Sequence, residues 1–292
     1  MTQASALRAA AVLERKRIRQ ERLAQLRRNP AFIAGAVLLG IWLIAAVFGN
    51  FLTRHDPGLV DVLNVNKKPS GEYWFGTDNI GRDVYSRIVA GTRPIILMAF
   101  SATMIATVLG TSLGLVTGYL KGRFDVIVMP ILDAISALPV IVIALLALAA
   151  LDGQSEVITV LIIGLVFTPI ITRTVRAAVL YEAELDYVAA AKLRTERMPH
   201  ILFVEILPNV LPPIIVEFTI RLGYAVFAIA TLSFLGVGVE LGSPNWGSQV
   251  AENYSGIFGN LWWATVFPAG AIATLAIGIN LIADSIMEAF EI

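Results

Sequence analysis

Long apolar segments separated by short polar stretches dominate the pattern of this sequence. Six of them are long enough to cross the hydrocarbon core of a membrane as a helix, which takes about 20 residues. The pattern predicts an all-α polytopic membrane protein with six transmembrane helices at residues 31–52, 94–119, 126–151, 157–178, 212–237 and 261–286. Pro130 and Pro139 lie in the third segment, where neighbouring helices are expected to satisfy the freed carbonyl groups.

Composition supports the membrane class and removes several alternatives. Hydrophobic residues make up 57% of the 292 residues and charged residues only 15%, which leaves too little polar surface for a soluble domain. The formal net charge is zero, so no nucleic-acid partner is indicated. There is no cysteine, and the two histidines, His55 and His200, lack metal-ligand spacing, so we expect no metal site.

Lysine and arginine indicate the orientation of the predicted helices. The tail before the first segment is basic, and so are the loops after the second and fourth segments. In contrast, residues 152–156 and 238–260 contain neither lysine nor arginine. Because cytoplasmic loops carry the excess of positive charge, we expect both termini to be cytoplasmic.

The same pattern divides the chain into three parts. Residues 1–30 form a basic cytoplasmic tail, residues 31–93 the first span and an extracytoplasmic segment, and residues 94–292 the remaining five spans. Apolar residues are interspersed among the charges at residues 8–28. They fit either a helix lying on the cytoplasmic leaflet or a solvated positive-inside signal.

One polar loop, residues 179–211, is the longest predicted cytoplasmic excursion between spans. Its pattern predicts two short helices joined at residues 194–198, the first with acidic residues early and Lys192 late, as the helix dipole favours. Pro208, Pro212 and Pro213 are expected to fix where the fifth span begins. On physical grounds the loop is either a protein-docking element or an ordinary connection.

Charged residues inside spans are costly and usually face a cavity or a partner. Asp133 lies in the third predicted span and Asp284 near the end of the sixth. Glu217 and Arg221 are four residues apart in the fifth, hence on one helical face. They either neutralise each other within the bundle or line a translocation pathway, where they would meet the charged ends of a peptide.

Three glycines recur at four-residue spacing in the second span, at Gly110, Gly114 and Gly118. Small residues at this interval allow two helix backbones to approach closely in lipid. We therefore interpret them as a helix-packing surface in preference to a pore lining.

The polar loop resembles the signature loop of membrane subunits of bacterial ABC importers. That pattern is Glu-Ala-Ala, three residues, Gly, nine residues, Ile, one residue, Leu-Pro. Ala190, Ala191, Leu207 and Pro208 match it, whereas Ala189, Thr195 and Glu205 replace its Glu, Gly and Ile. In the family this loop forms a coupling helix that sits in a cleft of the ATPase. The resemblance implies ATPase-coupling roles for Asp186, Tyr187, Ala190, Ala191, Lys192, Thr195, Leu207 and Pro208.

Further runs narrow the resemblance to the C-type subunit of the dipeptide, oligopeptide and nickel permease group. They include Phe75-Gly76-Thr77-Asp78, Leu232-Ser233-Phe234-Leu235-Gly236 and Pro244-Asn245-Trp246-Gly247. The resemblance implies a bacterial inner-membrane location, a related second membrane subunit, two ATPase subunits and an extracytoplasmic binding protein. ATP and magnesium would bind the ATPase subunits, because this chain has no G-x-x-x-x-G-K-[ST] loop.

The predicted outer segment, residues 53–93, is too long for a simple turn. We expect it to fold over the outer mouth and to help seat the binding protein, or else to anchor at the membrane surface through its aromatic residues. The candidate contacts on this face are Trp74, Asp78, Arg82, Asp83, Arg87 and Trp246.

Two other classes of protein are alternatives to the importer. A self-sufficient secondary transporter or channel often has inverted repeats, and no convincing repeat is visible. An intramembrane enzyme is not supported, because the sequence has no H-E-x-x-H or G-x-S-x-G motif. Within the importer class, peptides are favoured over nickel or another small solute.

Overall fold

The computed structural model describes residues 24–151, 155–240, 242–259 and 261–290. Within these residues the chain is helical, with irregular segments between the helices and one isolated β-bridge, Thr77 with Asp83. The expectation for the tail at residues 8–28 falls mostly on residues 1–23, outside the described residues.

Among the described residues, five helices are long and apolar enough to span a membrane, and a bent pair supplies a sixth candidate span. The all-α polytopic prediction is thereby confirmed. The long helices are α2 (Pro30–Leu52), α3 (Val84–Leu120), α6 (Glu156–Glu182), α9 (Leu207–Phe234) and α11 (Trp263–Phe290). The shorter elements are η1 (Val62–Asn64), α4 (Gly122–Ser136), α5 (Val140–Ala150), α7 (Asp186–Leu193), α8 (Met198–His200), η2 (Ile201–Ile206), α10 (Trp246–Asn253) and η3 (Tyr254–Gly259).

The third predicted span is broken, which corrects the expectation of one continuous helix over residues 126–151. Helices α4 and α5 are bent by 89° relative to each other. Proline disfavours helical backbone in the residue before it, and Pro139 itself has ψ 132°, so the helix ends before it and a new one begins at Val140. Pro130, in contrast, remains inside α4.

The fifth span also begins elsewhere than expected. A continuous helical segment runs from Met198 to Phe234, so Pro208, Pro212 and Pro213 lie inside it and do not mark its start. The stretch Ile201–Ile206 before these prolines is π-helical. Local π adjustments let a membrane helix accommodate the backbone groups that prolines leave free. The second half of the predicted polar loop is therefore the first part of the fifth membrane helix.

Close packing of α3 against α6 forms the centre of the bundle. A Cβ atom added at Gly110, Gly114 or Gly118 would lie 2.7, 2.7 or 2.8 Å from the Cβ atoms of Ile171, Val175 and Val179, respectively. Real Cβ atoms do not approach so closely, so only glycine permits this backbone separation. The prediction that the glycine stripe packs helices is confirmed.

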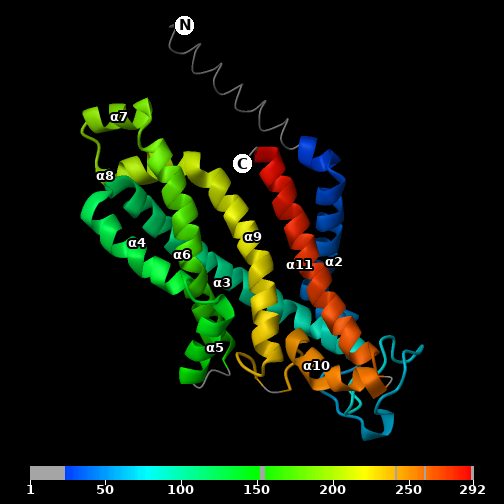
Figure 1. The fold of residues 1–292 in the computed structure, drawn as a ribbon. Helices are drawn as coiled ribbons and strands as arrows, with labels where there is room; N and C mark the ends of the chain where they lie inside the picture. Colours follow the sequence, from blue (N-terminus) through cyan, green and yellow to red (C-terminus); the bar gives the residue numbers. More distant parts are fainter. Residues whose placement is uncertain (1–23, 152–154, 241, 260, 291–292) are drawn as a thin grey trace.

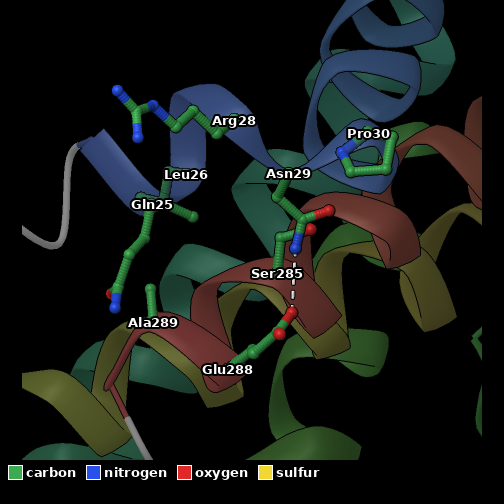
Figure 2. A pocket seen from close by; sticks show the side chains of 8 residues that line it. All are labelled: Gln25, Leu26, Arg28, Asn29, Pro30, Ser285, Glu288 and Ala289. Atoms are coloured by element: carbon green, nitrogen blue, oxygen red, sulfur yellow. Dashed lines mark hydrogen bonds between the residues drawn. The ribbon is translucent and has the colours of Figure 1, made fainter.

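The two ends of the bundle differ in construction. Helix α7, the start of α2 and the end of α11 lie at one end, which we call the α7 end (Figure 1). At the other end, residues 53–83 fold beside α10, and together they form what we call the capped end (Figure 1). At the α7 end, Asn29 caps α2 and donates from Nδ2 to Glu288 Oε2 of α11 at 2.8 Å, beside an open pocket of about 590 Å³ (Figure 2).

Candidate functional site: the α7 loop and the charged groups of the spans

Helix α7 projects from the bundle and is held there by its inner face. Val188 and Ala191 are fully buried, and the helix packs against η2 at the start of the fifth membrane helix. Ala189 on the opposite face is exposed, and Leu193 at the end is 86% exposed. Leu193 therefore leaves a large apolar side chain open to solvent at the tip of a helix whose inner face is packed.

Tyr187 joins the two membrane helices that flank α7. Its hydroxyl group donates to Glu182 Oε2 at 2.5 Å, at the end of α6, and accepts from Asn209 Nδ2 of α9 at 3.2 Å. Burial, followed by the hydrogen bond to Glu182, raises the pKa of Tyr187 to about 12. The phenol therefore stays protonated at neutral pH, and its two hydrogen bonds connect α7 with both α6 and α9.

The turn after α7 explains what Thr195 does in place of the family glycine. Thr195 has φ +57°, its N–H donates to Lys192 O at 2.9 Å, and Glu196 N–H donates to Ala191 O at 3.3 Å. These two bonds define a Schellman motif, in which the residue after the helix cap is left-handed and is usually glycine. Threonine thus adopts a left-handed conformation that glycine adopts without strain, and it does so at a cost in backbone strain.

Replacing Thr195 by glycine is expected to stabilise the protein by about 1 kcal/mol, because the left-handed strain of a β-branched residue is relieved. Thr195→Asn should recover part of this gain, since asparagine tolerates the left-handed region. Thr195→Ala keeps a Cβ atom and should gain little. Thermal unfolding of the detergent-solubilised protein measures the order of the stabilities. Identical midpoints for the three variants and the parent would contradict backbone strain at Thr195.

Ion pairs fix the rest of the loop. Arg194 binds both Glu196 (Nε to Oε1, 2.7 Å) and Glu205 (Nη2 to Oε1, 3.2 Å), and His200 Nε2 lies 3.3 Å from Glu196 Oε2. The hydrogen bond to Glu196 raises the pKa of Arg194. Glu205 stands where the family pattern has isoleucine, and in this chain it forms an ion pair with Arg194 across the turn.

Two contacts connect the start and the end of α7 to the corner between α3 and α4. Lys121 Nζ pairs with Glu184, and this hydrogen bond lowers the pKa of the Glu184 carboxyl group. Lys192 Nζ lies 5.2 Å from the ring centroid of Tyr119. Of the remaining predicted coupling residues, Asp186 is exposed in the first turn of α7, and Leu207 and Pro208 begin α9.

The candidate pathway residues fall into two ion pairs and one exposed carboxylate. Glu217 Oε1 and Arg221 Nε are 2.5 Å apart on α9, and the Glu217 residue is only 8% exposed. Asp133 Oδ1 lies 2.7 Å from Arg173 Nη2 on α6, a pairing between distant segments that the sequence did not indicate. Asp284 is exposed on α11. The structure therefore shows the Glu217–Arg221 pair, and a role in a pathway stays a prediction.

The capped end places most of the predicted outer contacts inside the protein. Asp78, Arg82, Asp83, Arg87 and Trp246 are all buried within the chain. Their contact with a binding protein stays a prediction. The physical reason for their burial is internal pairing: Arg82 Nε binds Asp78 Oδ2 at 2.6 Å and also pairs with Glu252 of α10. Among the six candidate contacts, Trp74 is the one that is exposed, at 49%.

Buried hydrogen bonds connect residues 53–83 and α3 to the α9–α11 region. Arg87 Nη2 donates to Ser243 O at 3.0 Å, and Trp246 Nε1 donates to Ile88 O at 2.8 Å. Trp263 Nε1 of α11 donates to Thr77 O at 3.0 Å. The segment thus caps one end of the bundle. Its two alternative roles, seating a binding protein and anchoring at the membrane surface, both stay predictions.

Sequence reasoning missed several residues that complete these sites. Leu193 lies between Lys192 and Thr195, to which the resemblance gives coupling roles, and nothing in the sequence indicates that its side chain is exposed. Glu182, Asn209 and Glu252 are polar residues near helix ends, and only the fold brings them to their partners. Their polarity beside apolar runs is the one signal that could have singled them out.

These features define a class: a polytopic membrane protein with a rigid helix held outside its bundle between two spans. The family described as "Binding-protein-dependent transport system inner membrane component" matches residues 110–291, and the "N-terminal TM domain of oligopeptide transport permease C" matches residues 19–69. The chain belongs to the family of binding-protein-dependent transport system inner membrane components, and its place is the inner membrane.

Two relatives support this assignment over nearly the whole length. The chain is 35% identical to the "Probable D,D-dipeptide transport system permease protein DdpC" of Escherichia coli (strain K12), over 91% of this chain and 89% of the relative. It is 34% identical to the "Dipeptide transport system permease protein DppC" of Alkalihalophilus pseudofirmus, over 93% and 89%, respectively. The expected resemblance to peptide permeases is confirmed.

Proposed function

We propose that this chain is one of two membrane subunits of an ABC importer, and that α7 is the helix on which a separate ATPase subunit acts. The observation that carries the proposal is the way α7 is held. Its tip is exposed, while Tyr187 connects it to α6 through Glu182 and to α9 through Asn209. A push on α7 would therefore move two membrane helices together, which is what coupling of ATP hydrolysis to transport requires.

The orientation follows from the same proposal. The α7 end would face the cytoplasm, where the ATPase binds its ATP and magnesium, and both termini would lie on that side. The basic residues 121, 123, 192, 194 and 197 at this end agree with the positive-inside rule. The exception is segment 53–93 at the capped end, whose six basic residues are nearly offset by five acidic ones. The capped end would then face the extracytoplasmic binding protein, with Trp74, stacked under Arg54 at 4.5 Å, as the exposed candidate contact.

Site-specific cross-linking tests the docking role directly, because the chain contains no cysteine of its own. Leu193→Cys, reacted with a short bifunctional reagent in native membranes, should give a cross-linked product with an ATPase subunit. Trp74→Cys is the matched control, since it is exposed at the opposite end and should give none. A product from Trp74→Cys but not from Leu193→Cys would reverse the proposed orientation.

The substrate proposed is a di- or oligopeptide. The printed names of the relatives, which are dipeptide and peptide permeases, support this class. Within the chain, Glu217 and Arg221 offer one negative and one positive group on the same face of α9. A peptide carries an ammonium group and a carboxylate, so an ion pair that opens on substrate arrival could meet both charged ends.

Removing either charge of this pair tests the pathway role. Glu217→Gln and Arg221→Gln each leave an uncompensated charge in a span, and peptide uptake should fall by roughly tenfold or more. The double variant Glu217→Gln/Arg221→Gln removes both charges and should recover assembly, measured by size-exclusion chromatography, but not uptake. Recovery of uptake as well as assembly in the double variant would show that the pair is purely structural.

A further inference from the structure

A groove on the outer surface of the bundle, between α2 and α3, contains an arginine within the length of the spans. Its volume is about 350 Å³. Leu43, Ala46 and Val47 of α2 line one side, and Arg93, Ile96 and Leu97 of α3 line the other. Leu43, Val47 and Leu97 are 44%, 73% and 53% exposed, so the walls are apolar and open outward.

Arg93 differs from the other arginines of the long helices. Arg87, Arg173, Arg176 and Arg221, on α3, α6 and α9, each lie within 4 Å of a carboxylate oxygen. Arg93 is exposed, and among the described residues no carboxylate pairs with it and no hydrogen bond from its guanidinium group is formed. An unpaired charge in a span is costly, so a ligand or partner is expected to supply the missing negative charge.

The position of the groove suits a lipid. Val47 lies five residues before the end of α2 at Leu52, or about 7 Å along the helix, and Leu43 lies about 13 Å from that end. The groove is thus in the half of the membrane nearer the capped end. From that depth the long side chain of Arg93 can extend to the interface while its methylene groups stay among the apolar walls.

We propose that this groove binds one phospholipid, with an acyl chain along Leu43, Val47 and Leu97 and the phosphate group on the guanidinium group of Arg93. Arginine presents paired donors that match phosphate oxygens, and the water-poor setting strengthens the contact. A helix of a partner protein would have to bring a carboxylate of its own to pair with Arg93, whereas every phospholipid carries a phosphate group.

Lipid binding to the purified transporter, with the subunits that copurify with it, tests the proposal. The complex is delipidated in detergent and titrated with phosphatidylglycerol or with a diacylglycerol of the same acyl chains, and native mass spectrometry counts the bound molecules. The parent protein should hold one tight phosphatidylglycerol at this groove and no tight diacylglycerol. Arg93→Gln should weaken phosphatidylglycerol binding by roughly fivefold or more, and Arg93→Lys by less.

A second pair of variants separates the contribution of the groove's shape from that of the charge on Arg93. Ala46→Phe fills the groove, keeps Arg93 and should also displace the lipid. Ile44→Phe adds the same ring on an exposed position of α2 that does not line the groove and should leave binding unchanged. If Arg93→Gln fails to assemble, the proposal is tested by Ala46→Phe and by the comparison of the two lipids on the parent protein. Equal phosphatidylglycerol occupancy in the parent and in Ala46→Phe, or equal binding of the two lipids, would overturn the proposal.

Discussion

Replacing Leu193 with glutamine is expected to reduce substrate uptake by roughly tenfold or more, while leaving the amount of folded protein unchanged. Burying a leucine side chain at an interface contributes about 1.5–3 kcal/mol, and each 1.4 kcal/mol is a factor of ten in affinity. Because Leu193 is 86% exposed in the chain itself, its loss should alter stability by no more than about 0.5 kcal/mol. Copurification of the ATPase subunits and peptide uptake in vesicles measure the two effects separately.

The matched control is Leu193→Met, which preserves an apolar side chain of similar volume and should retain most of the uptake. Normal uptake by Leu193→Gln would contradict docking through the tip of α7. A loss of folded protein in Leu193→Gln would instead indicate that Leu193 supports the structure of the chain.

Gly114→Ala is expected to destabilise the protein by about 1–3 kcal/mol, the usual cost of overpacking a close contact. The added Cβ atom would meet the Cβ atom of Val175 at 2.7 Å and the carbonyl oxygen of Thr172 at 3.0 Å, so α3 and α6 must separate. The thermal unfolding midpoint in detergent should fall accordingly, and dispersion of the size-exclusion peak should increase.

Gly40→Ala is the matched control for this substitution. A Cβ atom at Gly40, also in a membrane helix, would meet nothing within 4 Å, so this variant should be neutral or slightly stabilising. The double variant Gly114→Ala/Val175→Gly transfers the missing Cβ atom to the other helix and should recover part of the stability. Equal midpoints for Gly114→Ala and Gly40→Ala would show that the α3–α6 contact is looser than its geometry indicates.

Much of the fold could be predicted because membrane helices satisfy their own backbone hydrogen bonds. An apolar stretch of sufficient length has few other ways to cross lipid, so the spans follow from a local property of the sequence. The helix-packing role of Gly110, Gly114 and Gly118 could also be predicted, since their four-residue spacing places all three on one helix face. The loop signature located α7, and it identified the position of Thr195 as one that the family fills with glycine.

Proline was the least reliable local signal. Pro139 breaks its helix, whereas Pro94, Pro169, Pro212 and Pro213 lie inside theirs. The outcome depends on whether the surrounding backbone can adjust and on what packs beside each proline. Neither condition can be predicted from the residues next to the proline.

The sequence by itself determined the class of protein, the approximate positions of the spans and the segment that leaves the membrane. Only the tertiary structure decided which charges are buried, which are paired and which are left open. Arg87 and Arg93 are six residues apart on one helix, yet the first is enclosed beneath α10 and the second faces outward beside α2. The physical reason is that the cost of a charge depends on its partners and its solvent, and these are brought to it by segments far away in the chain.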